Sequence, residues 1–334
     1  MMSRKLGVAI VGCGLIGHKR ANALSGMRLV ACADLNLKNA EHLAATTEGC
    51  TAHRDWREAI SHPDVQIVIV ATLHDSLAEI TRGAIEAGRH VLVEKPAARR
   101  VEELQGLKRQ AREKNVQVRV GFNHRYHRNI QKAREMFESG VLGPLMFVRG
   151  RYGHGGRLGY DQEWRADPER SGGGELIDQG PHLIDLARWF LGDFVEVEGI
   201  ATTHYWDMPV DDNGFMMLRT ADQKVAFLHA SCTEWKNMFS FEIYGRNAKL
   251  DISGLGGSYG IERVTLYKMR PEMGPPETTI WEYPFPDNSW EVEVREFLQD
   301  IQLGRLSNPG LDAAISCLEV IEEIYERSPD DNRA

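Results

Sequence analysis

Short apolar runs alternate with amphipathic segments through the first 123 residues of the chain. Apolar runs bounded by turn residues are typical of strands buried on both faces, and the segments between them repeat with helical spacing. The predicted strands are LGVAIVG, RLVACAD, QIVIVAT, HVLVEK and VQVRVGF, and the predicted helices are GHKRANALS, LKNAEHLAATT, SLAEITRGAIEAG and VEELQGLKRQAREKN. Residues 51–53 are predicted as a short link and residues 56–60 as a helical turn. Strands that alternate with helices form a parallel sheet, so this part is predicted to be a doubly wound α/β domain.

The pattern changes after Asn123. A helix near residues 129–139 precedes PLMFVRGRYGH, which has strand character, and a loop rich in Gly, Asp and Arg then leads to a helical segment that ends at Leu191. The strands EVEGIATTHY, GFMMLRT, KVAFLHASC, FSFEIYG and RVTLYKM follow without helices between them. Apolar and polar residues alternate in FSFEIYG, as in a strand with one buried face. Consecutive strands of this kind predict an open, mostly antiparallel sheet. Two helices, at 290–303 and 311–326, are predicted to close the chain.

A chain of 334 residues is long for a single core, and the change of pattern gives the position of a domain boundary. We predict a Rossmann domain over residues 1–123. Residues 124–334 are predicted to form an α+β domain that contains the substrate site, the oligomer contacts and both C-terminal helices.

Composition narrows the class of protein. Hydrophobic residues make up 42% of the chain, and 40 basic against 48 acidic side chains give a net charge of −8. Because no long basic run interrupts this acidic balance, nucleic acid and anionic membranes are not expected as partners. The five cysteines show neither C-x-x-C nor zinc-ligand spacing, so no metal site is expected and a reducing compartment is favoured.

The first residues, MMSRKLGVAIVGCG, have the short basic start and apolar stretch of a lipoprotein signal. The apolar part is short, however, and runs directly into a glycine pattern that requires a strand before it. We therefore predict a strand there and a cytoplasmic protein without a membrane span.

The segment GCGLIG, residues 12–17, is a G-x-G-x-x-G between a predicted strand and a predicted helix. Its glycines permit a tight turn, close approach of a pyrophosphate and close helix–strand packing, and the helix N-terminus attracts the anion. Asp34 ends the second predicted strand, where a carboxylate can bind the ribose hydroxyls. No arginine follows Asp34 to receive a 2′-phosphate, and Lys38 is the nearest base, so NAD is favoured over NADP.

These segments, together with EKP at residues 94–96 and GGGELIDQGPHLID at residues 172–185, resemble the Gfo/Idh/MocA oxidoreductase family. The family is named for glucose–fructose oxidoreductase and inositol dehydrogenase, and the resemblance extends over essentially the whole chain. It implies that Lys95, Asp178 and His182 are catalytic. A lysine can stabilise a developing alkoxide, and a histidine is suited to take a proton near neutral pH. Without the resemblance, the sequence favours Asp178 as a helix cap and His182 as a buried core histidine. Which of Lys95 and His182 accepts the proton stays open.

The resemblance also extends the set of predicted binding residues. For the cofactor they are Gly12, Gly14, Leu15, Ile16, Gly17, Asp34, Thr72, Glu94, Lys95 and Asn123. For the substrate they are Arg125, Tyr152, Trp164, Arg165 and Asp178. Two features depart from the family pattern. Pro181 favours a kink or a helix start between Asp178 and His182, and the segment ATLHDSL (residues 71–77) has leucine where the family often has proline and then histidine.

The predicted function is NAD-dependent oxidation of a secondary hydroxyl of a sugar or cyclitol. The segment WRADPERSGGG is similar to those of family members that oxidise nucleotide-linked sugars at C3, and its arginines favour an anionic sugar, whereas acidic neighbours balance much of their charge. Two alternatives stay open: an NAD-dependent glycosidase with transient redox chemistry, and a non-catalytic NAD-binding regulator. An exposed sheet face predicts a homodimer or homotetramer.

Overall fold

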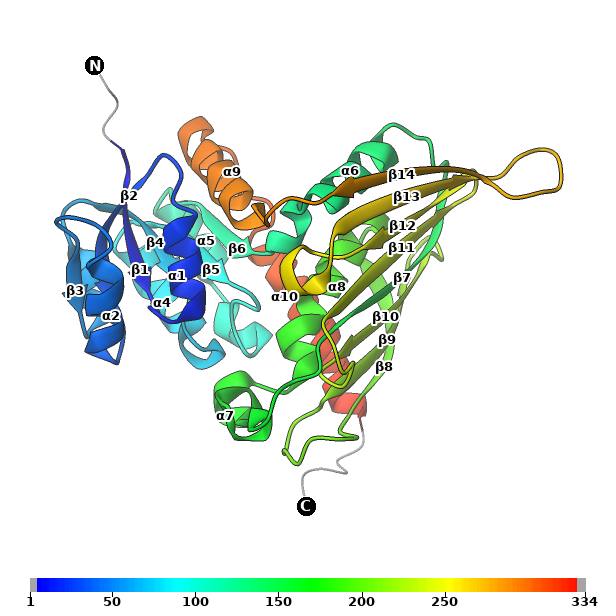
Figure 1. The fold of residues 1–334 in the computed structure, drawn as a ribbon. Helices are drawn as coiled ribbons and strands as arrows, with labels where there is room; N and C mark the ends of the chain where they lie inside the picture. Colours follow the sequence, from blue (N-terminus) through cyan, green and yellow to red (C-terminus); the bar gives the residue numbers. More distant parts are fainter. Residues whose placement is uncertain (1–4, 329–334) are drawn as a thin grey trace. The chain divides into compact units, whose positions relative to one another are not determined.

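The computed structural model describes residues 5–328, which divide into two compact units (Figure 1). The first unit consists of the chain up to Phe122 together with Trp290–Ile315, and the second consists of Asn123–Ser289 together with the chain from Ser316. The predicted boundary near residue 123 lies where the chain first passes from the first unit to the second, between Phe122 and Asn123. We expected the helix at 290–303 to belong to the second domain, whereas these residues belong to the first unit.

The first unit contains a six-stranded parallel sheet in the order β3-β2-β1-β4-β5-β6. Its strands are β1 (Gly7–Val11), β2 (Arg28–Ala33), β3 (Thr51–His53), β4 (Val65–Val70), β5 (His90–Glu94) and β6 (Val118–Gly121). Its helices are α1 (Leu15–Asn22), α2 (Leu37–Ala44), α3 (Trp56–Ser61), α4 (His74–Glu86), η1 (Val101–Leu104), α5 (Leu107–Glu113) and α9 (Ser289–Leu303), the last of which begins at the boundary. This strand order is that of a doubly wound dinucleotide-binding sheet, with its switch point between β1 and β4. The predicted α/β class is confirmed.

Two local predictions in this unit were wrong. Residues 51–53 form an edge strand that pairs with β2, where we predicted a link, because a three-residue strand is too short to show a pattern. The single helix predicted for VEELQGLKRQAREKN is divided into η1 and α5. Gly106 causes the interruption, since its φ of +78° is incompatible with a continuous right-handed helix.

Buried ion pairs explain why α9 joins the first unit. Arg20 of α1 contacts Glu293 of α9 at 2.5 Å, and Arg119 of β6 contacts Asp300 of α9 at the same distance. Phe297, on the same helix, is buried in the core formed by β1, β2 and their neighbours. The pairing of charged residues far apart in sequence cannot be read from a helical pattern alone.

The second unit is built on an eight-stranded sheet in the order β14-β13-β12-β11-β7-β10-β9-β8, in which only β7 and β10 pair in parallel. Its strands are β7 (Leu145–Gly153), β8 (Phe194–Thr202), β9 (Asn213–Thr220), β10 (Val225–Ser231), β11 (Met238–Gly245), β12 (Ala248–Ser253), β13 (Glu262–Lys268) and β14 (Glu277–Tyr283). Its helical elements are η2 (Asn123–Tyr126), α6 (Arg128–Glu138), η3 (Tyr160–Gln162), η4 (Trp164–Ala166), α7 (Pro168–Ser171), α8 (Glu175–Leu191) and η5 (Gly257–Tyr259). The boundary between units falls within α10 (Leu311–Arg327). The predicted open, mostly antiparallel sheet is confirmed.

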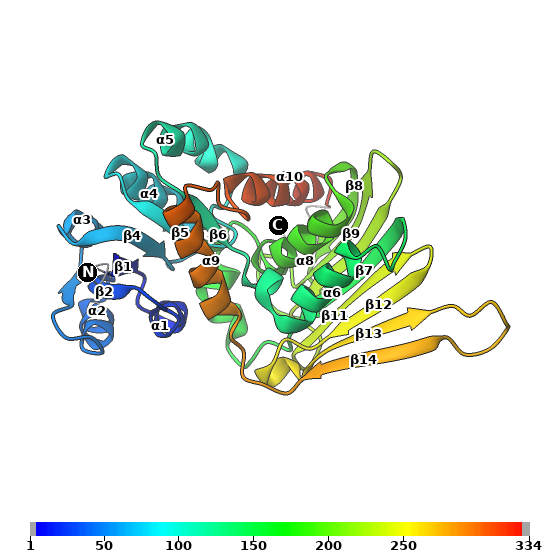
Figure 2. The ribbon, with the colours of Figure 1, turned by 90° about the horizontal axis from the view of Figure 1, so that it is seen from above.

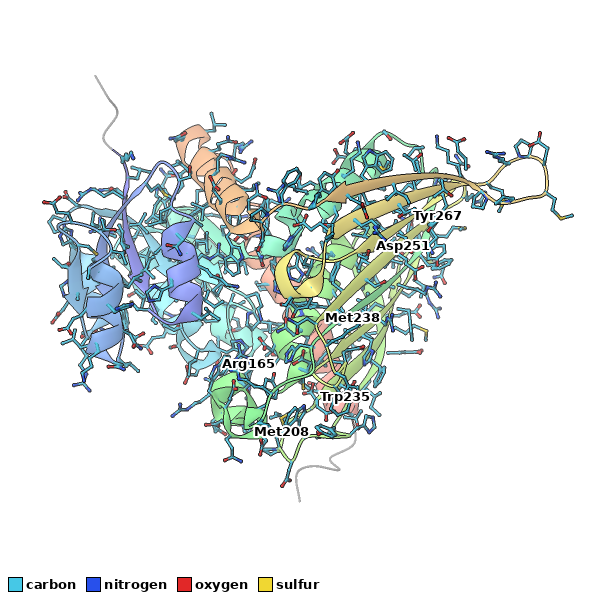
Figure 3. All side chains as sticks on the ribbon, viewed as in Figure 1. Arg165, Met208, Trp235, Met238, Asp251 and Tyr267 are labelled. Carbon is cyan, nitrogen blue, oxygen red and sulfur yellow. The ribbon has the colours of Figure 1, made fainter. Side chains whose placement is uncertain are left out.

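Helices cover one face of this sheet. α8 packs on β7, β9 and β10, and α6 packs on β12, β13 and β14 (Figure 2). In β11 the buried residues Phe239, Phe241 and Ile243 alternate with partly exposed ones, as the sequence predicts. The side chains of the opposite face project away from these helices (Figure 3).

Two strands of this sheet, β12 and β14, were missing from the sequence prediction. β12 is only six residues long, although Ala248, Leu250 and Ile252 alternate along it. β14 is an edge strand whose residues are mostly exposed, so it lacks an apolar alternation. No helix within residues 5–328 is both long enough and apolar enough to cross a membrane.

Candidate active site

The glycine turn after β1 is shaped by two backbone approaches. Gly12 has φ +92°, and a Cβ there would lie 2.4 Å from the carbonyl oxygen of Ala71, which follows β4. A Cβ on Gly17 would lie 2.1 Å from the carbonyl oxygen of Gly12, so glycine is required for α1 to pack on this turn. By contrast, a Cβ on Gly14 would meet nothing within 4 Å. The turn therefore leaves open space at the switch point of the sheet, where doubly wound folds bind their ligands.

Asp34 stands beside this turn at the end of β2. Its Oδ2 accepts a hydrogen bond from the backbone N–H of Cys13 at 2.8 Å, and its Oδ1 accepts one from the N–H of Asn36 at 2.9 Å. At the start of α1, Gly14 provides no side-chain cap, and the side chain of Leu15 is 75% exposed. Uncapped N–H groups and a fixed carboxylate fit the pyrophosphate and ribose of a dinucleotide, respectively.

Three other predicted cofactor residues lie at the carboxyl ends of β4 and β5. Thr72 follows β4, and its hydroxyl lies 3.0 Å from that of Ser76. Glu94 ends β5 but is buried, and it accepts a hydrogen bond from Nε of Arg20 at 2.6 Å. This ion pair gives Glu94 a structural role, and its contact with the cofactor stays a prediction. Lys95 comes directly after Glu94 and is half-buried.

In the second unit, α8 carries a row of buried polar residues. Glu175, Asp178, His182 and Asp185 recur at intervals of three or four residues, and each is no more than 5% exposed. The helix is continuous through Pro181, so Asp178 and His182 lie one turn apart on the same face. The departure from helical spacing expected at Pro181 does not occur.

Asp211 fixes the start of α8. Its carboxylate accepts hydrogen bonds from the N–H of Gly174 at 2.9 Å and from the N–H of Leu176 at 2.7 Å. The hydroxyl of Tyr325 donates to the same carboxylate at 2.8 Å, while burial raises the pKa of Asp211. The polar row on α8 therefore projects from a rigidly held helix end.

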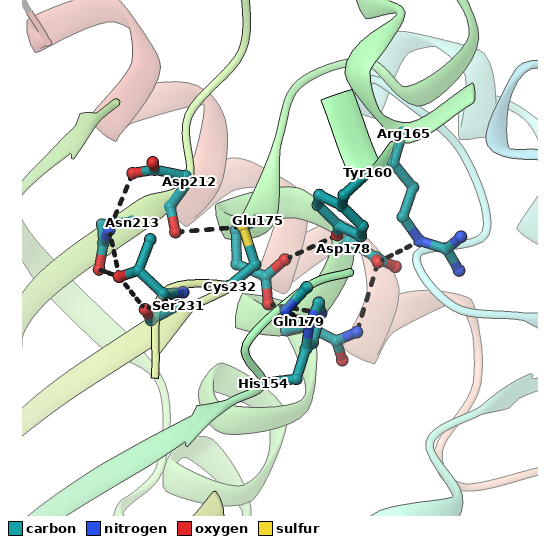
Figure 4. Close-up of polar contacts among 12 residues, drawn as sticks. His154, Tyr160, Arg165, Glu175, Asp178, Gln179, Asp212, Asn213, Ser231 and Cys232 are labelled. Atoms are coloured by element: carbon teal, nitrogen blue, oxygen red, sulfur yellow. Dashed lines mark hydrogen bonds and ion pairs between the residues drawn. The ribbon is translucent and has the colours of Figure 1, made fainter. Parts of the chain in front are cut away.

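Arg165 belongs to η4 and lies close to α7 (Figure 3). Nε of Arg165 donates to Oδ2 of Asp178 at 2.9 Å, and Nε2 of Gln179 donates to the same oxygen at 3.3 Å (Figure 4). The charge of Asp178 raises the pKa of Arg165. The guanidinium also lies 4.5 Å from the ring centroid of Trp164. The structure thus brings together three residues that the sequence predicts for this site.

Glu175 belongs to the same cluster, although the sequence analysis missed it. The hydroxyl of Tyr160 donates to its Oε2 at 3.4 Å, and Nε2 of His154 lies 3.6 Å from its Oε1 (Figure 4). Burial lowers the pKa of His154 and raises that of Tyr160. The available signal was the spacing of Glu175, which lies three residues before Asp178 in the same helix.

His182, one turn further along α8, lies in a group of aromatic rings. Its imidazole stacks on that of His124, which the sequence analysis also missed, with ring centroids 3.7 Å apart. Tyr152 lies edge-on to both imidazoles, at 4.8 Å from His124 and 5.9 Å from His182. Burial raises the pKa of Tyr152 well above its ordinary value, and the nearby Tyr259 raises it further.

Two predicted residues of η2 are engaged in contacts inside the second unit. Arg125 makes a two-pronged, buried ion pair with Asp185, with Nε and Nη2 at 2.7 and 2.6 Å from the carboxylate oxygens. This pair is a structural role for Arg125, and its contact with the substrate stays a prediction. Nδ2 of Asn123 donates to the hydroxyl of Ser289 at 3.0 Å.

A separate polar group lies near the start of α6. His127, Glu262 and Asp287 each offer a ligand atom within 4.8 Å of the others. Nδ1 of His127 is 3.0 Å from Oε1 of Glu262, which is the geometry of an ordinary buried hydrogen bond. This contact accounts for the proximity of His127 and Glu262, and Oδ1 of Asp287 lies further away, at 3.8 Å from Nδ1 of His127.

The chain belongs to the Gfo/Idh/MocA family of oxidoreductases. Residues 6–122 match the family's NAD-binding Rossmann fold, and residues 130–251 match its C-terminal domain. The expected family, enzyme class and NAD-binding domain are confirmed.

Curated relatives and solved structures agree with this assignment. Levoglucosan dehydrogenase of Pseudarthrobacter phenanthrenivorans is 27% identical over 293 residues, which are 74% of this chain and 73% of that protein. D-glucoside 3-dehydrogenase of Escherichia coli is 31% identical over 198 residues, 58% of this chain and 56% of that protein, so that alignment spans little more than half of each. A solved levoglucosan dehydrogenase in complex with NADH and levoglucosan shares the fold, with a TM-score of 0.87, 24% identity and 97% of each chain covered.

Proposed function

We propose that this protein is an NAD-dependent dehydrogenase that oxidises a secondary hydroxyl of an uncharged sugar or cyclitol, with C3 of a pyranose as the preferred position. The observation that carries the proposal is the buried row on α8, in which Asp178 and His182 share one face of an unbroken helix. A carboxylate and an imidazole one turn apart are suited to bind a polyol and to accept a proton from it. Two relatives, levoglucosan dehydrogenase and D-glucoside 3-dehydrogenase, are named for sugar substrates, and this supports the substrate class.

The loop arginines support an uncharged substrate over the anionic sugar that the sequence favoured. Arg157 contacts Glu163 at 2.7 Å, and Arg165 contacts both Asp178 at 2.9 Å and Glu163 at 3.6 Å. A phosphate or carboxylate would have to displace these carboxylates from the guanidinium groups. A neutral hydroxyl can instead accept or donate hydrogen bonds at the edges of the pairs.

The proposed roles follow from the chemistry of each side chain. The glycine turn and Asp34 fit NAD, which when bound accepts the hydride from the substrate carbon. Lys95 stabilises negative charge on the substrate oxygen, because an ammonium group attracts a developing alkoxide. His182 accepts the hydroxyl proton, and Asp178, held by Arg165, binds a neighbouring hydroxyl.

NADH formation tests this proposal. Purified protein is incubated with NAD and, in parallel, with levoglucosan, alkyl glucosides, free aldoses, inositols and UDP-sugars. Lys95→Ala and His182→Ala are expected to lower kcat by about 100-fold or more, since each removes a group that acts in the transition state. Lys108→Ala is the matched control, because Lys108 lies on the exposed face of α5 in an ion pair with Asp312.

The outcomes separate the alternatives. Turnover with UDP-sugars but not with neutral sugars contradicts the uncharged substrate class. Cleavage of a glycoside without net NADH formation supports the NAD-dependent glycosidase. NAD binding with neither reaction supports a regulator.

The open face of the eight-stranded sheet supports a homodimer or homotetramer, which we include in the proposal. Phe227 of β10 is 52% exposed, and its cross-strand partner Met217 of β9 is 40% exposed. Phe215 and Ile200 pair next to them in β9 and β8, and Ile200 is 40% exposed. A contiguous apolar surface of this kind is typical of a face covered by another subunit.

A further inference from the structure

His124 and His182 form a face-to-face pair. Their ring centroids are 3.7 Å apart, and their ring planes differ by 13°. His124 belongs to η2 and His182 to α8, and both side chains are about 5% exposed. Two elements distant in sequence thus place one buried imidazole flat against the other.

Three more rings enclose His124 at its edges. Tyr152 lies at 4.8 Å with an interplanar angle of 75°, Phe239 at 5.7 Å with 84°, and His127 at 5.7 Å with 74°. These are edge-to-face contacts, the arrangement that aromatic rings favour. His127 is itself held by a hydrogen bond of 3.0 Å to Glu262. The plane of the His124 ring is therefore fixed from several sides, and it presents a rigid flat surface to His182.

We propose that His124 is a positioning residue, whose ring face sets the plane of the His182 imidazole and so aims its nitrogens at the substrate hydroxyl. This inference rests on the proposed function, in which His182 takes the hydroxyl proton. The second side-chain torsion of histidine has a broad, two-fold energy profile, so the ring can turn unless a neighbour holds it. Proton transfer requires a nitrogen within hydrogen-bond reach and in line with the proton, and the nitrogens lie in the ring plane. A flat neighbour is thus a direct means of orienting this base.

Three substitutions of His124 separate stacking from simple packing. His124→Phe retains a flat ring, His124→Leu fills similar volume without one, and His124→Ala leaves a cavity. We expect His124→Phe to keep kcat within about 3-fold of the wild type. His124→Leu and His124→Ala are expected to lower kcat by about 100-fold, the effect of a misplaced catalytic group, with KM for sugar and Kd for NAD little changed.

A spectroscopic measurement reports the stack without any turnover. In protein with isotope-labelled histidine, the ring protons of His182 lie over the His124 ring and are expected upfield of those of an exposed histidine. The signal is assigned through its loss in His182→Gln. The upfield shift should persist in His124→Phe and disappear in His124→Leu. Thermal unfolding of each variant shows that it is folded.

Three results would overturn the inference: His124→Leu with wild-type kcat, equal losses in His124→Leu and His124→Phe, or an unchanged His182 signal in His124→Leu. Failure of the proposed function looks different, because then the wild type itself forms no NADH with any sugar, or His182→Ala retains full activity. The kinetics of the wild type and of His182→Ala therefore decide the function, and the comparison of Phe with Leu decides the role of His124.

Discussion

Nε of Arg165 donates to Oδ2 of Asp178 across 2.9 Å, and this contact links the loop after β7 to the first turn of α8. The Arg165 side chain is 32% exposed, whereas that of Asp178 is 6% exposed. A partly accessible cation therefore holds a nearly buried carboxylate one turn away from His182. Arg165 fixes the direction in which Asp178 accepts hydrogen bonds.

The first prediction concerns this contact. Arg165→Ala frees the Asp178 carboxylate to rotate, and we expect kcat/KM for the sugar to fall by about 100-fold through misplacement of a binding group. Arg165→Lys retains the charge without the planar guanidinium group, so its kcat/KM should lie between that of the wild type and that of Arg165→Ala. Arg157→Ala is the control, because that side chain is 71% exposed and contacts Glu163. Equal effects of Arg165→Ala and Arg157→Ala would show that the Asp178 contact is irrelevant to turnover.

Asp34 should control both affinity and choice of cofactor. Asp34→Ala removes a charged acceptor for the ribose hydroxyls, so we expect Kd for NAD to rise about 10- to 100-fold. The preference for NAD over NADP should narrow, because the carboxylate no longer repels a 2′-phosphate. Isothermal titration with both cofactors measures these changes. Lys38→Ala, on the adjoining helix, should alter neither affinity, and a large loss of NADP binding in Lys38→Ala would assign the 2′-phosphate site to Lys38 instead.

The ion pair between Arg119 and Asp300 should be a major contributor to stability. Asp300→Ala leaves the Arg119 charge buried without this carboxylate, and we expect the free energy of unfolding to fall by about 3–5 kcal/mol. Asp312→Ala removes the partner of Lys108 in an exposed pair and should cost less than about 1 kcal/mol. Urea unfolding of both variants measures the difference. Similar values for the two would mean that α9 is not anchored to the first unit by Asp300.

The partly buried His90 predicts a loss of stability in mild acid. Burial lowers the pKa of His90, whose unfolded value is about 6.5, so below that pH the unfolded chain binds a proton that the folded chain resists. The His90 contribution to the free energy of unfolding therefore falls as pH decreases through that value. Urea unfolding of the wild type and of His90→Gln at about pH 7.5 and about pH 5.5 isolates it. Between these two pH values the wild type should lose more stability than His90→Gln. Burial raises the pKa values of Asp211 and Glu293, so their contributions to stability change in the opposite direction. Both proteins contain these carboxylates, so the comparison cancels their contributions. Parallel pH dependence in the two proteins would contradict this prediction.

The open sheet face should determine the oligomeric state. Phe227→Asp places a charge in the apolar surface around Met217, and we expect it to shift the protein towards the monomer in sedimentation velocity. Ile261→Asp is the control, because Ile261 is 53% exposed but precedes β13 and lies outside that surface. A wild type that is already monomeric would refute the oligomer proposal. An oligomer that persists in Phe227→Asp would place the interface elsewhere.

The sequence predicted local features well because their causes are local. The order of strands and helices up to Asn123 follows from short-range periodicity. The turn between Gly12 and Gly17 follows from the positive φ of Gly12 and from the close backbone approach at Gly17. Asp178 and His182 are in register because helical spacing repeats every few residues. Pro181, which favours a kink, lies within α8 without ending the helix.

Other features depend on residues far apart in the chain. Glu94 pairs with Arg20 and Arg125 pairs with Asp185, because a buried charge is stabilised by an opposite charge that the fold brings next to it. The edge strand β14 exists through its ladder with β13, since its own residues carry no apolar alternation.

What the sequence by itself determined was the class of fold, the glycine turn with Asp34, and the catalytic candidates directly after β5 and on α8. What only the tertiary structure decided was which of these polar groups are already paired, that α9 joins the first unit, and that His124 lies flat against His182. The physical reason is the range of the interaction. Backbone conformation and amphipathic spacing are fixed within a few residues, whereas ion pairs and ring stacks are fixed by packing between segments that the sequence separates widely.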